Sequence, residues 1–334
     1  MNLSNKTILV TGGTGSFGKS FIDRIITNHK GIKKLLIYSR DELKQFNLSK
    51  QYNDKRYKFL RFFIGDVRDY KRLDWALKEV DIVIHAAALK QVPAAEYNPI
   101  EAIKTNILGA QNVIEASLNN NVQKVIALST DKASSPVNLY GATKLCSDKL
   151  FIAANNFRGR KKISFSVVRY GNIFGSRGSV VHTFLSQKKK DNILKITDPV
   201  MTRFLLSVEE GVDLVLWSII NSFGGEIVVP KIPSIKIIDI AKMVAPKSKI
   251  KIVGIRPGEK LHEELISIHE NRNCLSYKDK YLILDPLNYK LNNFYKKKGA
   301  KIVKNNFSYD SFTNKKYLSK QQFMKLFEKL NNSN

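Results

Sequence analysis

The sequence predicts a doubly wound α/β fold, in which helices cover both faces of a parallel sheet and the C-terminal part adds a smaller lobe. Three observations predict it. Short apolar runs alternate with helix-period stretches through the first half, a glycine-rich turn follows the first apolar run, and the alternation loosens after about Gly171. Parallel neighbours need crossover connections, and these crossovers bury both faces of the sheet. The first half is therefore expected to form the sheet.

The apolar runs of the first half are predicted to be buried strands because they are short and bounded by turn signals. They occupy residues 7–10, 35–38, 59–64, 82–85, 125–128 and 165–168. The stretches between them carry apolar residues at helical spacing, which predicts amphipathic helices at residues 17–26, 72–78, 100–117 and 140–155.

The C-terminal half is predicted to form the smaller lobe. It holds strand-like runs at residues 227–229 and 249–255, a helical stretch at 235–244 and a helix from Lys260, whereas the segment from Leu287 to Asn334 looks weakly structured. Ligands of open α/β sheets bind beyond the carboxyl ends of the strands, so we expect the lobe to close over that edge. We assign residues 1–170 to the sheet domain and residues 171–334 mainly to the lobe, with some segments returning to the sheet domain.

The composition indicates a folded, soluble, cytoplasmic protein. Of the 334 residues 43% are hydrophobic, but no apolar run approaches the length of a membrane-spanning helix, and no long apolar segment opens the chain. Cys146 and Cys274 lie far apart and outside any metal-binding spacing. We therefore expect no disulfide framework, no metal site and no membrane partner.

The chain is strongly basic. Its 56 basic and 29 acidic residues give a net charge of +27, which is compatible with a nucleic-acid partner. The lysine runs at residues 188–190 and 296–298, however, lack interleaved aromatic residues and a known nucleic-acid-binding motif. We expect no specific nucleic-acid partner, and instead a field that favours an anionic substrate.

The first predicted strand leads into a glycine-rich turn, TGGTGSFG, at residues 11–18. Glycine permits the tight turn and a close approach of backbone to a pyrophosphate, and the N-terminus of the following helix favours negative charge. A strand, such a turn and a helix in this order are typical of the Rossmann dinucleotide-binding unit. The residues expected to line the dinucleotide here are Gly12, Thr14, Gly15, Ser16, Phe17 and Gly18.

The end of the second predicted strand indicates which dinucleotide binds. An NAD enzyme places an acidic residue there for the ribose 2′-hydroxyl, whereas this chain has Ser39 and Arg40 first, with Lys44 soon after. Arg40 and Lys44 can hold a 2′-phosphate, which favours NADP. The alternative is that Asp41 takes the ribose and Arg40 is a solvated surface side chain.

Two further strand ends are expected to border the cofactor. Asp66 and Val67 follow the third strand, where the carboxylate can accept a hydrogen bond from the adenine amino group. Ala86 and Ala88 follow the fourth strand, where small side chains leave room for the dinucleotide.

Catalytic residue types follow the fifth predicted strand. Thr130, Asp131 and Lys132 stand at its end, and ten residues after Thr130 comes a Tyr140-xxx-Lys144 pair. Tyrosine and lysine at positions i and i+4 share a helical face. A nearby ammonium lowers the pKa of a phenol, so the tyrosinate can take a proton from a substrate hydroxyl while hydride leaves the same carbon. This combination predicts alcohol oxidation by a nicotinamide.

Together these motifs resemble the extended short-chain dehydrogenases/reductases. Within them, blocks such as TGGTGSFGK, ALSTDKA, NLYGATKLCSDKLF and GIRPGEKLHE resemble the soluble UDP-N-acetylglucosamine 4,6-dehydratases that invert C5, the first enzymes of pseudaminic acid biosynthesis. The resemblance extends from about Thr7 to Glu264. It implies an NADP-binding first domain, a substrate-binding lobe and a homo-oligomer that pairs through the helices at residues 100–117 and after Tyr140.

The resemblance also implies roles for the catalytic residues. Tyr140, supported by Lys144 and Thr130, would remove the C4 hydroxyl proton as hydride leaves C4. Lys132 would abstract the C5 proton, and Asp131 would help the C6 hydroxyl to depart as water. A lysine acts as a base only if its pKa is lowered, and Asp131 beside it opposes this, so the division of roles is a hypothesis.

Other positions match family residues near the ligands. Thr105 and Asn106 match positions near the cofactor, although Asn106 can instead tie neighbouring loops together. The positions implied to contact the UDP-sugar are Lys90, Asn172, Arg177, Gly178, Ser179, Val180, Arg256 and Glu259.

Alternative functions stay open at this point. A C5-retaining nucleotide-sugar dehydratase or a 4-epimerase would share most of these motifs, and an epimerase would not need an acid–base pair at residues 131 and 132. A non-catalytic dinucleotide-binding regulator would have no reason to keep Asp131, Lys132, Tyr140 and Lys144 together.

Overall fold

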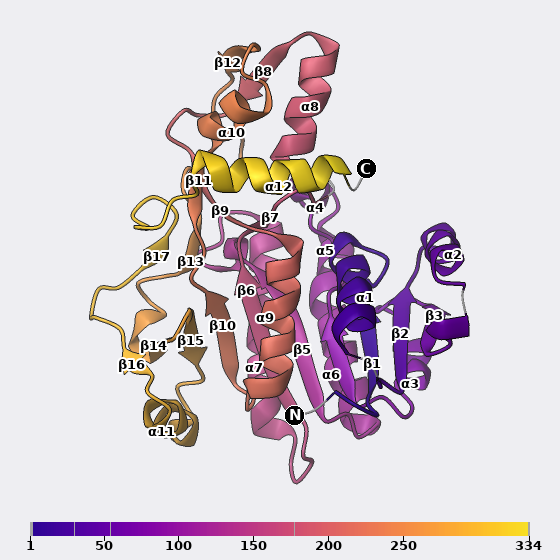
Figure 1. Cartoon of the computed structure of the whole chain (residues 1–334). Coiled ribbons are helices and arrows are strands. Elements are labelled where there is room, and N and C mark those ends of the chain that lie inside the picture. Colours follow the sequence, from indigo (N-terminus) through magenta and orange to yellow (C-terminus); the bar gives the residue numbers. More distant parts are fainter. Residues whose placement is uncertain (1–2, 30, 54, 177, 333–334) are drawn as a thin grey trace.

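The centre of the molecule is one large twisted sheet (Figure 1). The computed structural model describes residues 3–29, 31–53, 55–176 and 178–332, and within them the sheet has ten strands in the order β16-β14-β15-β10-β6-β5-β4-β1-β2-β3. Seven strands run parallel: β1 (Thr7–Thr11), β2 (Lys34–Ser39), β3 (Leu60–Ile64), β4 (Ile82–His85), β5 (Lys124–Thr130), β6 (Ser164–Tyr170) and β10 (Glu226–Pro230). Antiparallel strands extend it: β15 (Lys280–Leu284), β14 (Cys274–Tyr277) and β16 (Lys301–Ile302). The predicted doubly wound fold and the six predicted strands are confirmed.

Helices cover both faces of this sheet. In Figure 1, α1 (Ser16–Asn28) and α9 (Val208–Asn221) lie in front of the strands, while α6 (Gly109–Asn119) and α7 (Leu139–Phe157) lie behind them. The remaining helices of the sheet region are α2 (Glu42–Gln51), α3 (Tyr70–Ala76), α4 (Val92–Tyr97), α5 (Pro99–Ile103), a π-helical turn (Lys104–Leu108) and 3₁₀ turns at Lys55–Tyr57 and Asp131–Ala133.

The smaller lobe stands above the carboxyl ends of the parallel strands (Figure 1). It contains α8 (Val180–Lys190), β8 (Ile193–Ile196), α10 (Ile237–Val244), β12 (Lys249–Ile252) and α12 (Lys320–Asn332). A three-stranded sheet of β7 (Asn172–Ile173), β9 (Thr202–Leu206) and β11 (Ser234–Lys236) connects the lobe to the main body. The expected position of the lobe is confirmed, while the division of the chain at residue 170 stays a prediction.

Two predictions for the C-terminal half are wrong. No helix begins at Lys260, because β13 (Glu264–Ile266) pairs with β17 (Tyr309–Asp310), and the distant Ser311 takes up backbone hydrogen bonds of Glu263. Residues 288–332 are also well structured: they form α11 (Tyr289–Lys297), β16, β17 and α12. A 3₁₀ turn (Asn271–Asn273) lies between β13 and β14. The first error arises because non-local pairing stabilises β13 and β17, whose local pattern is weak. The second arises because the apolar residues of α11 and α12, which lie at helical spacing, were overlooked.

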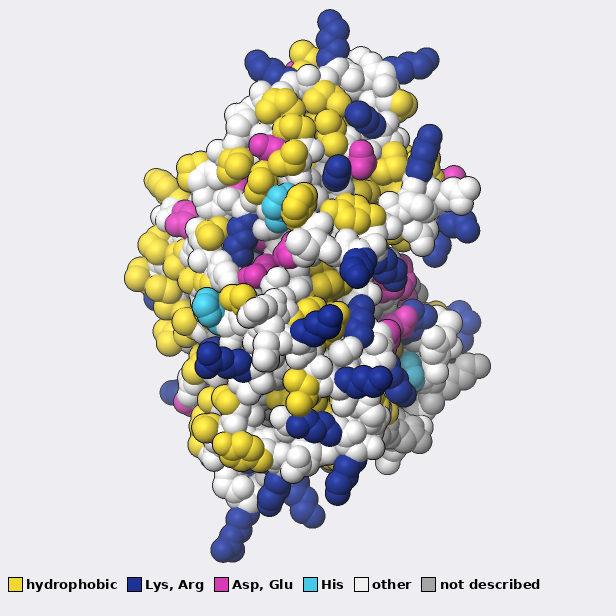
Figure 2. All heavy atoms as spheres, turned by 90° about the vertical axis from the view of Figure 1, so that its left-hand side faces the viewer, with side chains coloured by type: hydrophobic (Ala, Val, Ile, Leu, Met, Phe, Trp, Pro, Cys, Tyr) yellow, Lys and Arg dark blue, Asp and Glu magenta, His cyan; other side chains and the backbone are white. Residues whose placement is uncertain are grey.

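Basic side chains are dispersed on the surface. On the face drawn in Figure 2, lysines and arginines lie scattered between apolar and acidic side chains from the lobe to the opposite end of the molecule. Among the described residues, no helix is long and apolar enough to cross a membrane.

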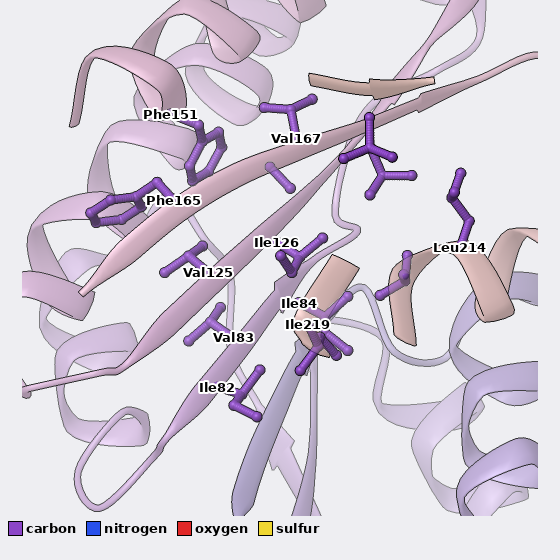
Figure 3. Close-up of a cluster of buried hydrophobic side chains, with 14 of the residues drawn as sticks. Ile82, Val83, Ile84, Val125, Ile126, Phe151, Phe165, Val167, Leu214 and Ile219 are labelled. Atoms are coloured by element: carbon purple, nitrogen blue, oxygen red, sulfur yellow. The ribbon is translucent and has the colours of Figure 1, made fainter. Parts of the chain in front are cut away.

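The main core lies between the sheet and its helices. Figure 3 shows part of it, where Val83 of β4, Val125 of β5 and Phe165 of β6 lie on neighbouring strands, and Phe151 of α7 lies beside Phe165. These side chains are fully buried, because central parallel strands are covered on both faces. A second cluster of buried apolar residues fills the lobe. This arrangement leaves the carboxyl ends of the strands between two separately packed cores.

Candidate active site

The glycine-rich turn forms a cradle between β1 and α1. Gly12 has φ +65°, and a Cβ placed on it would lie 2.9 Å from Cα of Ala87. A Cβ on Gly18 would lie 2.0 Å from the carbonyl oxygen of Gly13, so α1 packs directly on the turn. Within the described residues no side chain caps the N-terminus of α1, which begins at Ser16. Bare backbone amides at a helix N-terminus suit a pyrophosphate, so the residues present fit the predicted dinucleotide.

The turn residues lie as expected for such a cradle. Thr14 is buried and its Oγ1 donates to Oγ of Ser39 at 3.2 Å, which joins the turn to the end of β2. Phe17 is buried in the main core, and Gly15 is the N-cap of α1.

Arg40 and Lys44, the two cations expected to hold a phosphate after β2, have different surroundings. The Arg40 side chain is 56% exposed, and its Nη1 lies 3.8 Å from Oδ2 of Asp66. Lys44 forms an ion pair with Asp41, and Asp41 also caps α2 by accepting the backbone N–H of Lys44. The Arg40 guanidinium is therefore partly exposed beside Asp66, whereas the ammonium of Lys44 is paired with the N-cap residue of its own helix.

Asp66 also has partners in the protein. Its carboxylate accepts from the backbone N–H of Arg68 at 3.0 Å and from the guanidinium of Arg68 at 2.7 and 3.0 Å. Val67 beside it is buried and packs against Gly109 at the start of α6. The predicted contact between Asp66 and adenine stays a prediction.

The loop after β4 is fixed by Asn106. The Asn106 side chain accepts from the backbone N–H of Leu89 at 2.8 Å and donates to the Leu89 carbonyl at 2.9 Å and to Thr143 Oγ1 at 3.0 Å. The structure thus favours the interpretation that Asn106 ties loops together. Thr105 precedes it in the π-helical turn, and its buried Oγ1 makes no hydrogen bond within the described residues. Ala86 and Ala88 lie in the loop that Asn106 holds.

Thr130, Asp131 and Lys132 form a compact polar cluster at the end of β5. Oγ1 of Thr130 and Nζ of Lys132 both lie 3.0 Å from Oδ1 of Asp131. Asp131 is 1% exposed, and burial raises its pKa against the opposing charge of Lys132. Partial burial would lower the pKa of Lys132, but the nearby carboxylates outweigh burial and raise it. Asp131 therefore suits proton donation, and Lys132 is an ammonium at neutral pH.

The cluster includes Glu263, which the sequence analysis did not single out. Its Oε1 lies 3.0 Å from Nζ of Lys132, although 131 positions separate the two residues in the chain. Glu263 is the last residue of the block GIRPGEKLHE, but that pattern gives it no partner, and its pairing with the distant Ser311 helps to hold it at the end of β5.

Tyr140 and Lys144 lie on α7 beside this cluster. Burial raises the pKa of Tyr140 to about 12, against the charge of Lys132 and a hydrogen bond with Thr130. Burial also lowers the pKa of Lys144, which the carboxylate of Asp148 opposes. The pKa of the phenol is therefore raised overall in the protein alone, because burial outweighs the charge of Lys132 and the hydrogen bond with Thr130.

A buried charged network lies beneath Lys144. Arg169 is fully buried, with Nη2 3.2 Å from Oδ2 of Asp148 and Nη1 2.9 Å from Oε1 of Glu270. Ser129 donates to the same Asp148 oxygen at 2.7 Å. Asp148 follows Lys144 by four residues on the helix, a spacing that could have identified it from the sequence.

The lobe brings most of the predicted substrate residues to the same edge. Asn138 of the α7 N-terminus donates to the carbonyl of Gly258 at 2.7 Å, which places the loop of Arg256 and Glu259 beside Tyr140. Arg256 is 63% exposed and lies 3.8 Å from Glu259.

A second loop meets the same edge. A Cβ on Gly178 would lie 3.1 Å from Nε2 of Gln91, so this loop approaches Lys90. Ser179 precedes α8, which starts at Val180, and its buried Oγ makes no hydrogen bond within the described residues. Asn172 is exposed in β7, and Arg177 lies outside the described residues.

Comparison with a family model gives one match. The model described as "Polysaccharide biosynthesis protein" matches residues 8–285. A UDP-N-acetylglucosamine 4,6-dehydratase (inverting) of Campylobacter jejuni is 52% identical to this chain over 332 residues, which is 97% of each chain. A UDP-glucose 4-epimerase of Rickettsia bellii is 48% identical over 272 residues, which is 80% of this chain and 79% of that one.

Solved structures share the fold. The X-ray structure of Pen from Bacillus thuringiensis has a TM-score of 0.89 at 35% identity and covers 99% of this chain and 100% of that chain. DesIV, a dTDP-glucose 4,6-dehydratase from Streptomyces venezuelae, has a TM-score of 0.67 at 21% identity and covers 76% of this chain and 86% of that chain. This second likeness concerns the fold alone.

Proposed function

The chain belongs to the polysaccharide biosynthesis protein family of extended short-chain dehydrogenases/reductases, and from that premise we propose that it is a UDP-N-acetylglucosamine 4,6-dehydratase that inverts C5. The observation that carries this proposal is the cluster of Asp131, Lys132 and Tyr140 at one strand end. It combines a buried acid, an ammonium and a phenol within one site. The 52% identity to the inverting dehydratase of C. jejuni, over nearly the whole of both chains, supports the same reaction.

Tyr140 begins the proposed reaction by taking the proton of the C4 hydroxyl. The residues of the glycine-rich turn would hold a nicotinamide dinucleotide, which would supply the hydride chemistry at C4 and C6. Burial keeps Tyr140 protonated in the protein alone, so the tyrosinate has to form in the loaded site, with Lys144 and the ammonium of Lys132 as the nearby cations. The resulting C4 ketone makes the C5 proton acidic.

Asp131 and Lys132 carry the elimination and the inversion. Asp131, whose pKa burial raises, gives a proton to the departing C6 hydroxyl. In the inversion Lys132, as an ammonium, gives a proton to C5, and water takes up the C5 proton that leaves in the elimination. The hypothesis that Lys132 is the C5 base requires its amine form, because an ammonium has no free electron pair. If Lys132→Ala left the exchange of the C5 proton with solvent unchanged, a role for Lys132 at C5 would be wrong.

The cofactor and the product follow from the same proposal. We propose NADP because Arg40, rather than an acidic residue, is the first residue after β2, where its guanidinium can reach a 2′-phosphate. The product is UDP-2-acetamido-2,6-dideoxy-β-L-arabino-hexos-4-ulose, an intermediate for pseudaminic acid. The diphosphate would be held by the loops of Lys90, Ser179 and Arg256.

We further propose that the enzyme works in the cytoplasm as a homo-oligomer. Ile100 of α5 and Leu108 of the π-helical turn are 57% and 51% exposed, and they lie within the helical segment expected to pair between subunits.

A 4-epimerase is the second candidate, because the R. bellii relative carries that name. Epimerisation at C4 uses Tyr140 and the nicotinamide but needs no acid at C6. The buried Asp131 and its ion pair with Lys132 favour the dehydratase.

Proton NMR of UDP-N-acetylglucosamine incubated with the purified protein in D₂O tests this proposal. A 4-keto-6-deoxy sugar with deuterium at C5 and the couplings of the inverted ring is expected. Retained C5 configuration would contradict inversion while keeping the dehydratase. Unchanged substrate after addition of NADP, or formation of the C4 epimer, would contradict the dehydratase.

A further inference from the structure

Glu263 is a buried carboxylate fixed at the catalytic cluster. Its backbone N–H donates to Ser311 Oγ at 2.9 Å, and its carbonyl accepts from the backbone N–H of Ser311 at 2.8 Å. Ser311 is itself fully buried and joined to Thr202 Oγ1 at 2.7 Å. Glu263 is 2% exposed, so neither its backbone nor its side chain can move far from Lys132.

The carboxylate of Glu263 lies close to two cationic side chains. Oε1 lies 3.0 Å from Nζ of Lys132 and 3.6 Å from Nε of Arg203. Oε2 is buried and accepts no hydrogen bond within the described residues. The carboxylate of Glu263 therefore forms ion pairs with Lys132 and Arg203.

The charges around Glu263 determine the proton distribution in the site. Burial would raise the pKa of Glu263, but Lys132 and Arg203, with Lys260 contributing less, lower it overall. The same negative charge adds to the raised pKa of Asp131. Glu263 thus keeps its negative charge, Lys132 keeps its proton, and the carboxyl group of Asp131 is the one that gains a proton most readily.

We propose that Glu263 is a positioning residue, the counter-ion that holds Lys132 as an ammonium beside Asp131 and so prepares Lys132 to donate a proton to C5. This inference rests on the dehydratase function proposed above and deepens it. Glu263 acts through Lys132 and is not assigned a contact with the sugar.

In this role Lys132 completes the inversion. The enolate carbon at C5 takes a proton from the ammonium: one N–H bond breaks, one C–H bond forms, and the electron pair of that N–H bond stays on nitrogen. The neutral amine then regains a proton from water, which balances the C5 proton that water takes up in the elimination. A neutral lysine cannot perform this step, which gives Glu263 a measurable effect on the reaction.

The charge of Lys132 can be measured without turnover. Acetic anhydride reacts only with the amine form, so trace acetylation at fixed pH, followed by mass spectrometry of the Lys132 peptide, reports the amine fraction. We expect Glu263→Gln to speed labelling of Lys132 by about tenfold for each unit by which the pKa falls. Exposed Lys188 normalises the rates.

Glu264→Gln is the matched control for this experiment. Glu264 is the next residue in the chain and accepts from Ser135 Oγ at 2.7 Å, so its variant also loses one charge while an amide oxygen can still accept that bond. Labelling of Lys132 should stay at the wild-type rate. If Glu263→Gln does not fold, Glu263→Asp can replace it, because it keeps the negative charge but moves it away from Lys132 by the length of one methylene group. The acetylation rate of Lys132 should then rise less than we expect for Glu263→Gln.

Turnover tests the consequence for the reaction. We expect Glu263→Gln to lower kcat by about tenfold or more with little change in KM, and to shift the alkaline limb of the pH profile to lower pH. In a Lys132→Gln background, Glu263→Gln should add no further loss, because its effect passes through Lys132.

Three results would overturn the inference: unchanged labelling of Lys132, a rise in kcat at neutral pH, or additive losses in the double variant. If wild-type protein makes no 4-keto-6-deoxy sugar, the proposed function fails, and labelling alone then decides whether Glu263 holds the charge of Lys132.

Discussion

His85 ends β4 next to the dinucleotide cradle, and its protonation is controlled by burial. Thr11 Oγ1 accepts the backbone N–H groups of Ala86 and Ala87, so its own proton is directed to Nδ1 of His85 at 2.9 Å. Burial lowers the pKa of His85 to about 3, and the charge of Lys144 adds to this. The imidazole therefore stays neutral in the folded protein at pH values where an unfolded chain would protonate it.

This difference predicts a loss of stability in acid. Because the folded pKa of His85 lies below the unfolded value near 6.5, the unfolded state binds the extra proton as the pH falls from about 6.5 toward 3. The free energy of unfolding should fall by about 2 kcal/mol between pH 7 and pH 5 from this residue alone. Urea unfolding at the two pH values measures the loss.

His85→Asn is the variant for this prediction, because its Oδ1 can replace Nδ1 as the acceptor for Thr11. It should reduce the difference between the two pH values by about 2 kcal/mol. An unchanged difference in the variant would mean that other groups cause the acid sensitivity.

Some residues of the site could be predicted from the sequence and others could not. Asp131, Lys132 and Tyr140 were found because a strand end and a helix start lie close together in the chain. Glu263 ends the quoted block GIRPGEKLHE, but its contact with Lys132 was not found, because Glu263 is held there with the help of Ser311 in a segment that looked weakly structured. Lys44 was assigned to a phosphate from charge alone, whereas the structure pairs it with Asp41.

At the scale of elements, the contact between α1 and the glycine-rich turn can be tested. A Cβ on Gly18 would lie 2.0 Å from the Gly13 carbonyl oxygen, which belongs to backbone and cannot turn aside. Gly18→Ala should therefore push α1 away from the turn and raise the Kd for NADP by about tenfold or more, a loss of about 1.4 kcal/mol. Isothermal titration calorimetry on the purified protein measures this.

Gly211→Ala provides the control for that measurement. Gly211 lies in α9, and a Cβ there would meet its nearest neighbours at 4.0 Å, an ordinary contact. Alanine should leave the Kd for NADP unchanged and favour the helix by about 1 kcal/mol. Equal Kd values for the two variants would contradict the role given to Gly18.

Elements differed in how well the sequence predicted them. The central parallel strands were predictable because burial on both faces makes each a continuous apolar run. The strands β13 and β17 were not, since each is short and depends on the other. The π-helical turn at Lys104–Leu108 lies inside a stretch with ordinary helical spacing, so its wider turn left no sequence signal.

At the scale of the whole molecule, the C-terminal helix connects the lobe to the candidate substrate loop. In Figure 1, α12 crosses the molecule between the lobe and the sheet. Phe323 is fully buried in the lobe core and meets Phe174 edge-on, with ring centroids 5.4 Å apart. Leu330 packs against Gly175, at the start of the loop that contains Ser179. The last helix of the chain thus supports a loop assigned to the UDP-sugar.

Because the two cores are separate, damage to α12 should affect the two ligands differently. Phe323→Ala removes a buried aromatic ring, which costs about 3–5 kcal/mol of packing in the lobe. We expect KM for UDP-N-acetylglucosamine to rise, because the loop at Ser179 loses its support. The Kd for NADP should stay at the wild-type value, since the cradle belongs to the other core.

Steady-state kinetics and calorimetry on the same preparations measure these two effects. Gln321→Ala, an exposed position on α12, is the control and should change neither value. Equal losses for both ligands in Phe323→Ala would show that the two cores unfold together. An unchanged KM would show that the substrate loop keeps its place without α12, and the tail would then have only a local structural role.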